Sequence, residues 1–231
     1  MIAGKSELLQ TIATIEDVLI DIYGDRAGVS AGDFLMSQEY FEHMNPQKTG
    51  LRAGLYLAEE AGELLLGIHF APDLMEKIQQ TPPVDRLTHL NLDAFCVVVE
   101  EVSHLRLLSD RAHCGLNVSQ IELEWQAEVD KVWVASQLLN RQCGDPHFGP
   151  LTRAIFDTST TTDADDAPRY DEASRLAAVL WYSLLATADS DRQLASGTAL
   201  RGLFRRLYNL NWAEKASFLD GKANLKSALA A

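Results

Sequence analysis

The sequence predicts an α+β protein that is predominantly α-helical: a helical bundle around a long antiparallel helical hairpin, with one β-hairpin packed on it. The first observation is that most long segments repeat their apolar residues with the period of an α-helix. The second is that residues 55–70 alternate apolar and other residues as β-strands do. Hydrophobic residues make up 47% of the 231 residues, which is enough for a sizeable core.

The first half of the chain begins with a well-marked helix. Residues 5–23 place apolar residues at helical spacing on one face, and Gly24 follows as a stop signal. Residues 33–41 are a weaker helical prediction. A short helix over 72–80 begins at a proline, and two further prolines end it.

Between these helices, residues 55–70 predict a β-hairpin rather than an Ala/Glu/Leu helix. Apolar residues alternate on both sides of Gly62, which lies where a turn is expected. This assignment removes Glu60 and Glu63 from the acidic residues that a helix could present to a metal ion.

Residues 90–113 and 119–142 predict two long helices joined by a short loop. Gly115 and Gly144 each follow one of these helices, where a left-handed glycine is the usual C-terminal cap. Because the connecting loop is short, we expect the two helices to pack as an antiparallel hairpin.

The start of the second long helix is specified by a capping box of Ser119 and Glu122. We therefore assign Glu122 a structural role and exclude it from the candidate site. In the hairpin, Cys114 faces Ser119, and counting back along both helices brings His104 within one turn of Glu128.

The C-terminal third contains a polar segment and two further predicted helices, over 169–188 and 197–219. Its last residues, Leu229–Ala231, are similar to the end of bacterial degradation tags. The chain is thus expected to divide into a core domain over 1–156, a polar linker over 157–168, a helical pair over 169–220 packed on the core, and a flexible tail over 221–231.

Charge and cysteine usage exclude several classes of protein. The formal net charge is −13, so we expect no nucleic-acid partner and no membrane surface as a partner. No apolar run approaches the roughly 18 residues of a membrane span, and the N-terminus lacks the pattern of a secretory signal. Three cysteines without a C-x-x-C pair predict a reduced, cytoplasmic protein, with Cys96 as a core residue.

One predicted helix is apolar nearly all the way round and carries a narrow polar stripe. Within residues 92–105, Asp93, Glu100 and His104 fall inside roughly a 40° arc at about 100° per residue. A helix that is apolar on most sides is normally buried, and buried ionisable groups must be paired or neutralised. The stripe is therefore a structural network or a functional site.

Three interpretations of this stripe remain open. The first is a buried His104–Glu128 pair that fixes the helix register, with Lys131 compensating its charge. The second is a proton switch or acid–base site. The third is a zinc, iron or manganese site that uses His104 with Glu100, Glu101 or Glu128. Glu101-x-x-His104 is half of the paired pattern of helical di-iron proteins, and the sequence contains no second copy.

The remaining histidines and a basic cluster are weaker candidates. We expect His69 to face outward from the β-hairpin, and His113 to lie at a helix C-terminus where a cation is favourable. His147 follows a proline in a loop. A basic cluster on the last helix is expected to pair with the chain's own acids, or to dock an acidic partner or phosphate: Arg201, Arg205 and Arg206.

Two motifs together carry a resemblance to a known family. Val102-Ser103-His104 and the segment Leu123–Lys131, with the sequence LEWQAEVDK, resemble a family of uncharacterised bacterial proteins. The similarity spans roughly residues 50–185. It implies a bacterial cytoplasmic protein and carries no activity, ligand or reaction.

The sequence lacks the motifs of common enzyme classes, including a phosphate-binding glycine loop, a nucleophile elbow and a His-Glu-x-x-His motif. It therefore favours a non-enzymatic protein–protein interaction or regulatory protein that works with a protein partner or as a homo-oligomer. The alternative is a metal-dependent or acid–base helical enzyme centred on Glu100, His104 and Glu128.

Overall fold

The computed structural model describes residues 3–45, 50–60, 63–157, 167–187, 194 and 198–220. These residues are mostly helical, with a single antiparallel β-hairpin among them, which confirms the predicted fold class. The elements in chain order are α1 (Ala3–Tyr23), η1 (Ala31–Phe34), α2 (Gln38–Met44), β1 (Ala53–Glu60), β2 (Glu63–Phe70), α3 (Pro72–Gln80), α4 (Leu92–His113), α5 (Gln120–Cys143), α6 (Phe148–Phe156), α7 (Ala167–Thr187), α9 (Thr198–Asn209) and α10 (Trp212–Asp220).

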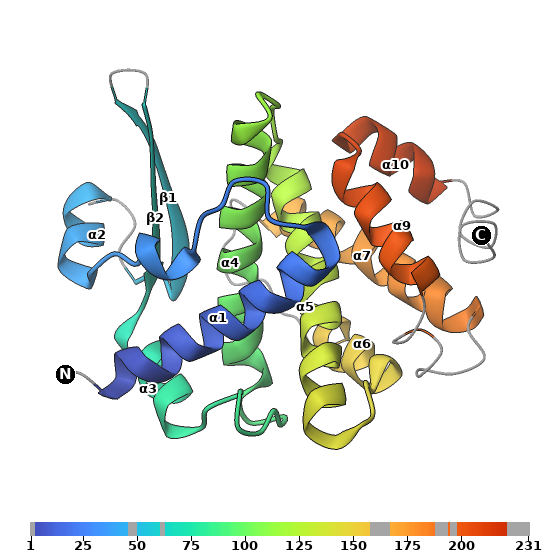
Figure 1. The fold of residues 1–231 in the computed structure, drawn as a ribbon, viewed down its shortest axis with the longest axis horizontal. Coiled ribbons are helices and arrows are strands. Elements are labelled where there is room, and N and C mark those ends of the chain that lie inside the picture. The colour runs from blue at the N-terminus through green and yellow to red at the C-terminus, as the bar shows by residue number, and fades with distance from the viewer. Residues whose placement is uncertain are drawn as a thin grey trace.

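The antiparallel pair α4 and α5 forms the centre of the molecule (Figure 1). Helix α1 crosses this pair, the β-hairpin and α2 lie on one side of it, and α9 and α10 lie on the other. Helix α7 packs along α5, where the indole nitrogen of Trp181 donates to the carbonyl of Val129 at 3.2 Å. One continuous hydrophobic core joins these elements. Its aromatic centre consists of Trp133, Phe148, Trp181 and Phe204.

The predicted ends of the two long helices are confirmed. The backbone N–H of Glu122 donates to the hydroxyl of Ser119 at 3.3 Å, which caps the start of α5. Gly115 and Gly144 follow their helices with φ angles of 66° and 73°, in the left-handed region that favours glycine. The local sequence signals therefore position the central helical pair.

The predicted β-hairpin is also confirmed, with Ala53 paired to Phe70 at its base and Glu60 to Glu63 at its far end. The predicted turn residue, Gly62, lies outside the described residues. The prediction that His69 faces outward is wrong. His69 is buried and stacks on the ring of Phe41 at 4.2 Å, because α2 covers the face of the strand that alternation alone assigns to solvent.

The C-terminal half departs from the prediction in two places. Helix α6 forms where no separate helix was expected. The single helix predicted over 197–219 is two helices, because Asn211 starts a new one. Its side chain accepts from the N–H of Glu214 at 3.0 Å, and its own N–H donates to the carboxylate of Glu214 at 2.9 Å.

Most of the predicted linker and the whole predicted tail, including Leu229–Ala231, lie outside the described residues. Among the helices that are described, none combines the length and the apolar character needed to cross a membrane.

Candidate functional site

A polar seam runs along the interface between α4 and α5. The hydroxyl of Ser103 donates to the carboxylate of Asp130 at 2.6 Å. About two helical turns further along α4, Arg111 donates to the carboxylate of Glu122 at 2.7 Å. Both pairs follow the register that the short connecting loop predicts. Because the register is fixed at these points, the ionisable residues of α4 meet a defined set of partners on α5.

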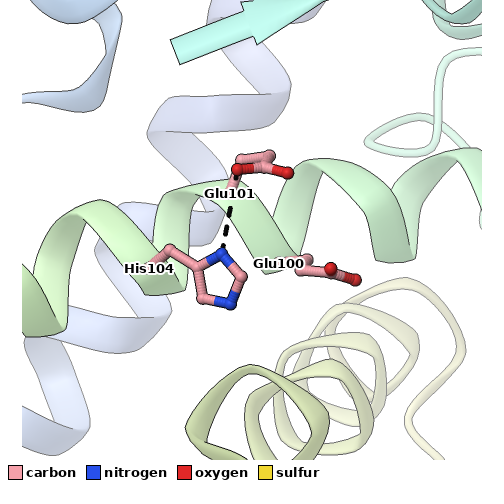
Figure 2. A group of neighbouring side chains, drawn as sticks. All are labelled: Glu100, Glu101 and His104. Atoms are coloured by element: carbon pink, nitrogen blue, oxygen red, sulfur yellow. Dashed lines mark ion pairs between the residues drawn. The ribbon is translucent and has the colours of Figure 1, made fainter. Parts of the chain in front are cut away.

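Glu100, Glu101 and His104 on α4 form the most concentrated group in this seam (Figure 2). One possible ligand atom from each lies within 4.8 Å of the others. The imidazole of His104 lies between two carboxylates: its Nδ1 is 3.8 Å from Glu101, and its Nε2 is 3.3 Å from Glu124 on α5. The structure therefore brings together three of the four predicted ligand candidates.

Two atoms of this group are buried without a hydrogen bond among the described residues. They are Nε2 of His104 and Oε2 of Glu101, whose residues are only 7% and 6% exposed. A buried polar atom that makes no hydrogen bond is costly. Each atom instead faces another ionisable group, Nε2 of His104 facing Glu124 at 3.3 Å and Oε2 of Glu101 facing Nδ1 of His104 at 3.8 Å, so a shared proton or a bound cation would satisfy both.

The expected contact between His104 and Glu128 is replaced by one with Glu124, which the sequence reasoning missed. Glu128 instead binds the ammonium of Lys131 at 2.7 Å, and the same ammonium binds Glu100 at 2.6 Å. The ammonium draws Glu128 away from the imidazole. Glu124 precedes Glu128 by one helical turn and shares its face, and that spacing was the signal that could have identified it.

Asp93 does not belong to the buried stripe, contrary to the prediction. Its side chain is 64% exposed, and it binds Arg52 at 2.5 Å beside Lys77. The guanidinium of Arg52 lowers the pKa of Asp93. The stripe ends here because the first turn of α4 reaches the surface of the bundle.

Inside the cluster, burial and the neighbouring charges shift the pKa values of Glu101 and His104 in opposite directions. Burial raises the pKa of Glu101, although His104 opposes this shift. Burial alone would lower the pKa of His104, but its contacts with Glu101 and Glu124 outweigh it, and the pKa of His104 is raised. Glu101 and His104 therefore both hold protons more tightly than the free side chains do.

The cluster contains more negative than positive charge. Its carboxylates are contacted by two permanent cations among the described residues, Lys131 and Arg169, and Arg169 reaches Glu124 at 3.6 Å from α7. With a neutral imidazole, this leaves an excess of two negative charges over four carboxylates: Glu100, Glu101, Glu124 and Glu128. One divalent cation, or two protons, would neutralise it.

Further along the seam, Asp130 belongs to a hydrogen-bonded network that sequence reasoning missed. It accepts from Tyr23 at 2.6 Å, from Ser103 at 2.6 Å and from Gln126 at 3.1 Å. Burial raises the pKa of Asp130 to about 6, although these donors oppose the shift. Its oxygens have partners, so this network is a structural link between α1, α4 and α5.

The side chain of Glu122 has a different role from the capping box to which it was assigned, since only its backbone N–H contacts Ser119. Its carboxylate binds Arg111 at 2.7 Å and Lys215 of α10 at 2.8 Å, and Lys215 is fully buried. Burial lowers the pKa of Lys215 to about 8. This cluster attaches α10 to the central helical pair.

The weaker candidates have local explanations. His113 is exposed at the end of α4, and His147 lies beside Asp145 at the start of α6. In the basic cluster, Arg201 binds an acid of its own chain, Asp21, as expected. Arg205 instead donates to the carbonyl of Ile22, and Arg206 lies over the ring of Phe218.

Cys96 is half-buried on α4, and burial raises the pKa of its thiol to about 12. It is therefore an unreactive thiol.

Comparison of the chain with protein-family models, curated proteins and solved structures finds no significant match. The resemblance drawn from the two helical motifs stays a prediction, and the function must be argued from the cluster itself.

Proposed function

We propose that the protein is a metal-dependent helical protein that binds one divalent transition-metal ion between α4 and α5. Glu100, Glu101 and His104 supply the donors from α4, and Glu124 supplies one from α5. The observation that carries this proposal is that one imidazole and several carboxylates converge in a nearly buried position, where Nε2 of His104 and Oε2 of Glu101 make only contacts of 3.3 and 3.8 Å with other ionisable groups.

The donor set defines the class of metal. One imidazole with carboxylates suits zinc, manganese or iron rather than calcium or magnesium, which prefer oxygen ligands alone. Zinc binds such ligands at about 2.0–2.2 Å. The candidate ligand atoms of Glu100, Glu101 and His104 lie within 4.8 Å of one another. Glu101 and Glu124 face different nitrogens of the His104 ring, so the imidazole must turn for one ion to contact both carboxylates. A bound ion with an open position would act as a Lewis acid on a substrate.

Charge balance also supports the proposal. The cluster has an excess of two negative charges when the imidazole is neutral, which is the protonation state that a metal requires. A divalent ion would replace the two protons that otherwise neutralise the site. A purely structural ion pair does not need this excess of carboxylates.

The test is metal analysis of untagged full-length protein, purified without chelator and then exposed to zinc, manganese or ferrous iron. We expect about one ion per chain in the wild type, loss of that ion in His104→Ala, and retention in His113→Ala. His113 is the matched control, because it lies on the same helix but is exposed.

Circular dichroism must show that His104→Ala keeps its helices. A wild type that takes up none of the three metals contradicts the proposal. So does a His104→Ala variant that binds as much metal as the wild type. A metal-free wild type that His104→Ala destabilises by about 1–3 kcal/mol identifies a structural pair.

A second candidate function is docking to another protein, and the β-hairpin favours it. The hairpin extends away from the helices (Figure 1). Leu57 and Leu65 stay 52% and 38% exposed, and their pairing places them on opposite faces of the ribbon. Exposed leucines on both faces of a projecting hairpin fit a protein or a second copy of the chain as partner.

A further inference from the structure

The ammonium of Lys131 lies beside the proposed metal site, in a position where a metal ion could bind. Its ammonium nitrogen lies 2.6 Å from Glu100 of α4 and 2.7 Å from Glu128 of its own helix. Its side chain is only 11% exposed, and the two carboxylates are 20% and 13% exposed. An ammonium held by two nearly buried carboxylates has the surroundings of a bound cation.

Glu100 is the member that the two positions share. Its carboxylate binds Lys131, and it also belongs to the group of potential ligands with Glu101 and His104. Lys131 and the proposed metal ion are therefore neighbours across one carboxylate. In a helical bundle, carboxylates that bridge in this way commonly hold two metal ions.

We propose that the cluster has positions for two cations, and that the ammonium of Lys131 occupies the second one, between Glu100 and Glu128. Lys131 thereby limits the centre to one metal ion. This inference rests on the proposed function of the cluster. The ammonium cannot leave, because the side chain tethers it to α5, so a second ion would have to displace it. Displacement would remove the nearly buried ammonium from both of its carboxylate partners, which is strongly unfavourable.

Removal of the ammonium is expected to open the second position. In Lys131→Met the chain keeps a side chain of similar length, while Glu100 and Glu128 lose their shared counter-ion. Two facing carboxylates then remain next to the first ion, and a second zinc ion can bind between them. Lys131→Arg preserves the positive charge and is the matched control.

The experiment is a zinc titration of metal-free full-length protein by calorimetry, with zinc per chain counted again after gel filtration. We expect one ion in the wild type and in Lys131→Arg, and two in Lys131→Met. Adding Glu128→Gln to Lys131→Met should return the count to one, because it removes a ligand of the second position only.

Lys131→Gln repeats the test if Lys131→Met does not fold, since its amide can still donate to a carboxylate. One zinc ion in both the wild type and the neutral variants overturns the inference and leaves the metal site intact. Two ions in the wild type also overturn it. A wild type without zinc overturns the proposed function. In that case, a gain of one ion in the neutral variants still supports Lys131 as the bound cation, and no gain overturns both.

Discussion

Asp130 shows how one buried carboxyl couples folding to pH. It is 1% exposed, and burial raises its pKa from 3.8 to about 6. The folded protein therefore holds this proton more tightly than the unfolded chain. The stabilisation is complete below the unfolded pKa and is lost as the pH rises through the folded pKa.

We predict that the free energy of unfolding falls by about 2 kcal/mol between pH 4 and pH 7 because of this carboxyl, at about 1.4 kcal/mol for each pKa unit. Asp130→Asn should remove this part of the pH dependence. Urea denaturation of both proteins at the two pH values measures it. The exposed Asp17→Asn on α1 is the control. Equal pH dependence in the wild type and Asp130→Asn contradicts the prediction.

At the same scale, sequence periodicity identified the polar residues of α4 but not all of their partners. Glu100 and His104 were predicted because they share a stripe on one helix, and Glu101 because it lies three residues before His104. Glu124 was missed because the choice between two carboxylates one turn apart depends on where the ammonium of Lys131 lies. Such a choice is made by tertiary contacts, which a local pattern does not contain.

Single elements were predictable where a local signal sets them. The cap at Ser119 and the glycines after α4 and α5 define their helix ends through backbone geometry alone. The same kind of signal, Asn211 with Glu214, marks the break between α9 and α10 and was overlooked. The burial of His69 could not be predicted, because alternation does not say which face α2 covers.

Two glycines in helical settings should respond to alanine with opposite signs. Gly144 has a φ of 73°, so Gly144→Ala should lower the free energy of unfolding by about 1 kcal/mol. Gly202 lies inside α9 with open space around its Cα, so Gly202→Ala should raise that free energy by about 0.5–1 kcal/mol. Chemical denaturation measures both, and equal signs would falsify this account of the two positions.

At the scale of the whole molecule, the β-hairpin is the element least covered by the rest of the protein. If it contacts a second copy of the chain, Leu57→Glu should shift the protein from dimer to monomer in sedimentation-velocity experiments. Leu116→Glu, an equally exposed leucine in the loop between α4 and α5, is the control. A wild type that stays monomeric at high concentration contradicts self-association and directs the search to a different protein.

The overall fold was predictable to the extent that the hairpin of α4 and α5, which has clear sequence signals, organises it. The polar seam, the long helices and the β-hairpin follow from periodicity and caps. The attachment of α10 through Lys215 does not, because it joins residues that lie far apart in the sequence. Glu122 illustrates the limit: the hydroxyl of Ser119 caps α5 as predicted, but the carboxylate of Glu122 binds the distant Arg111 and Lys215.

A helical hairpin joined only by apolar side chains can dock in several positions that differ by one turn. In this protein, a slip of one turn would carry Glu122 away from Arg111 and place it opposite Leu107. It would also separate Ser103 from Asp130. Each misaligned position leaves a charge against an apolar surface, so the polar pairs of the seam specify a single register of the two helices. The polar pairs of the seam thus disfavour the neighbouring alignments of the two helices.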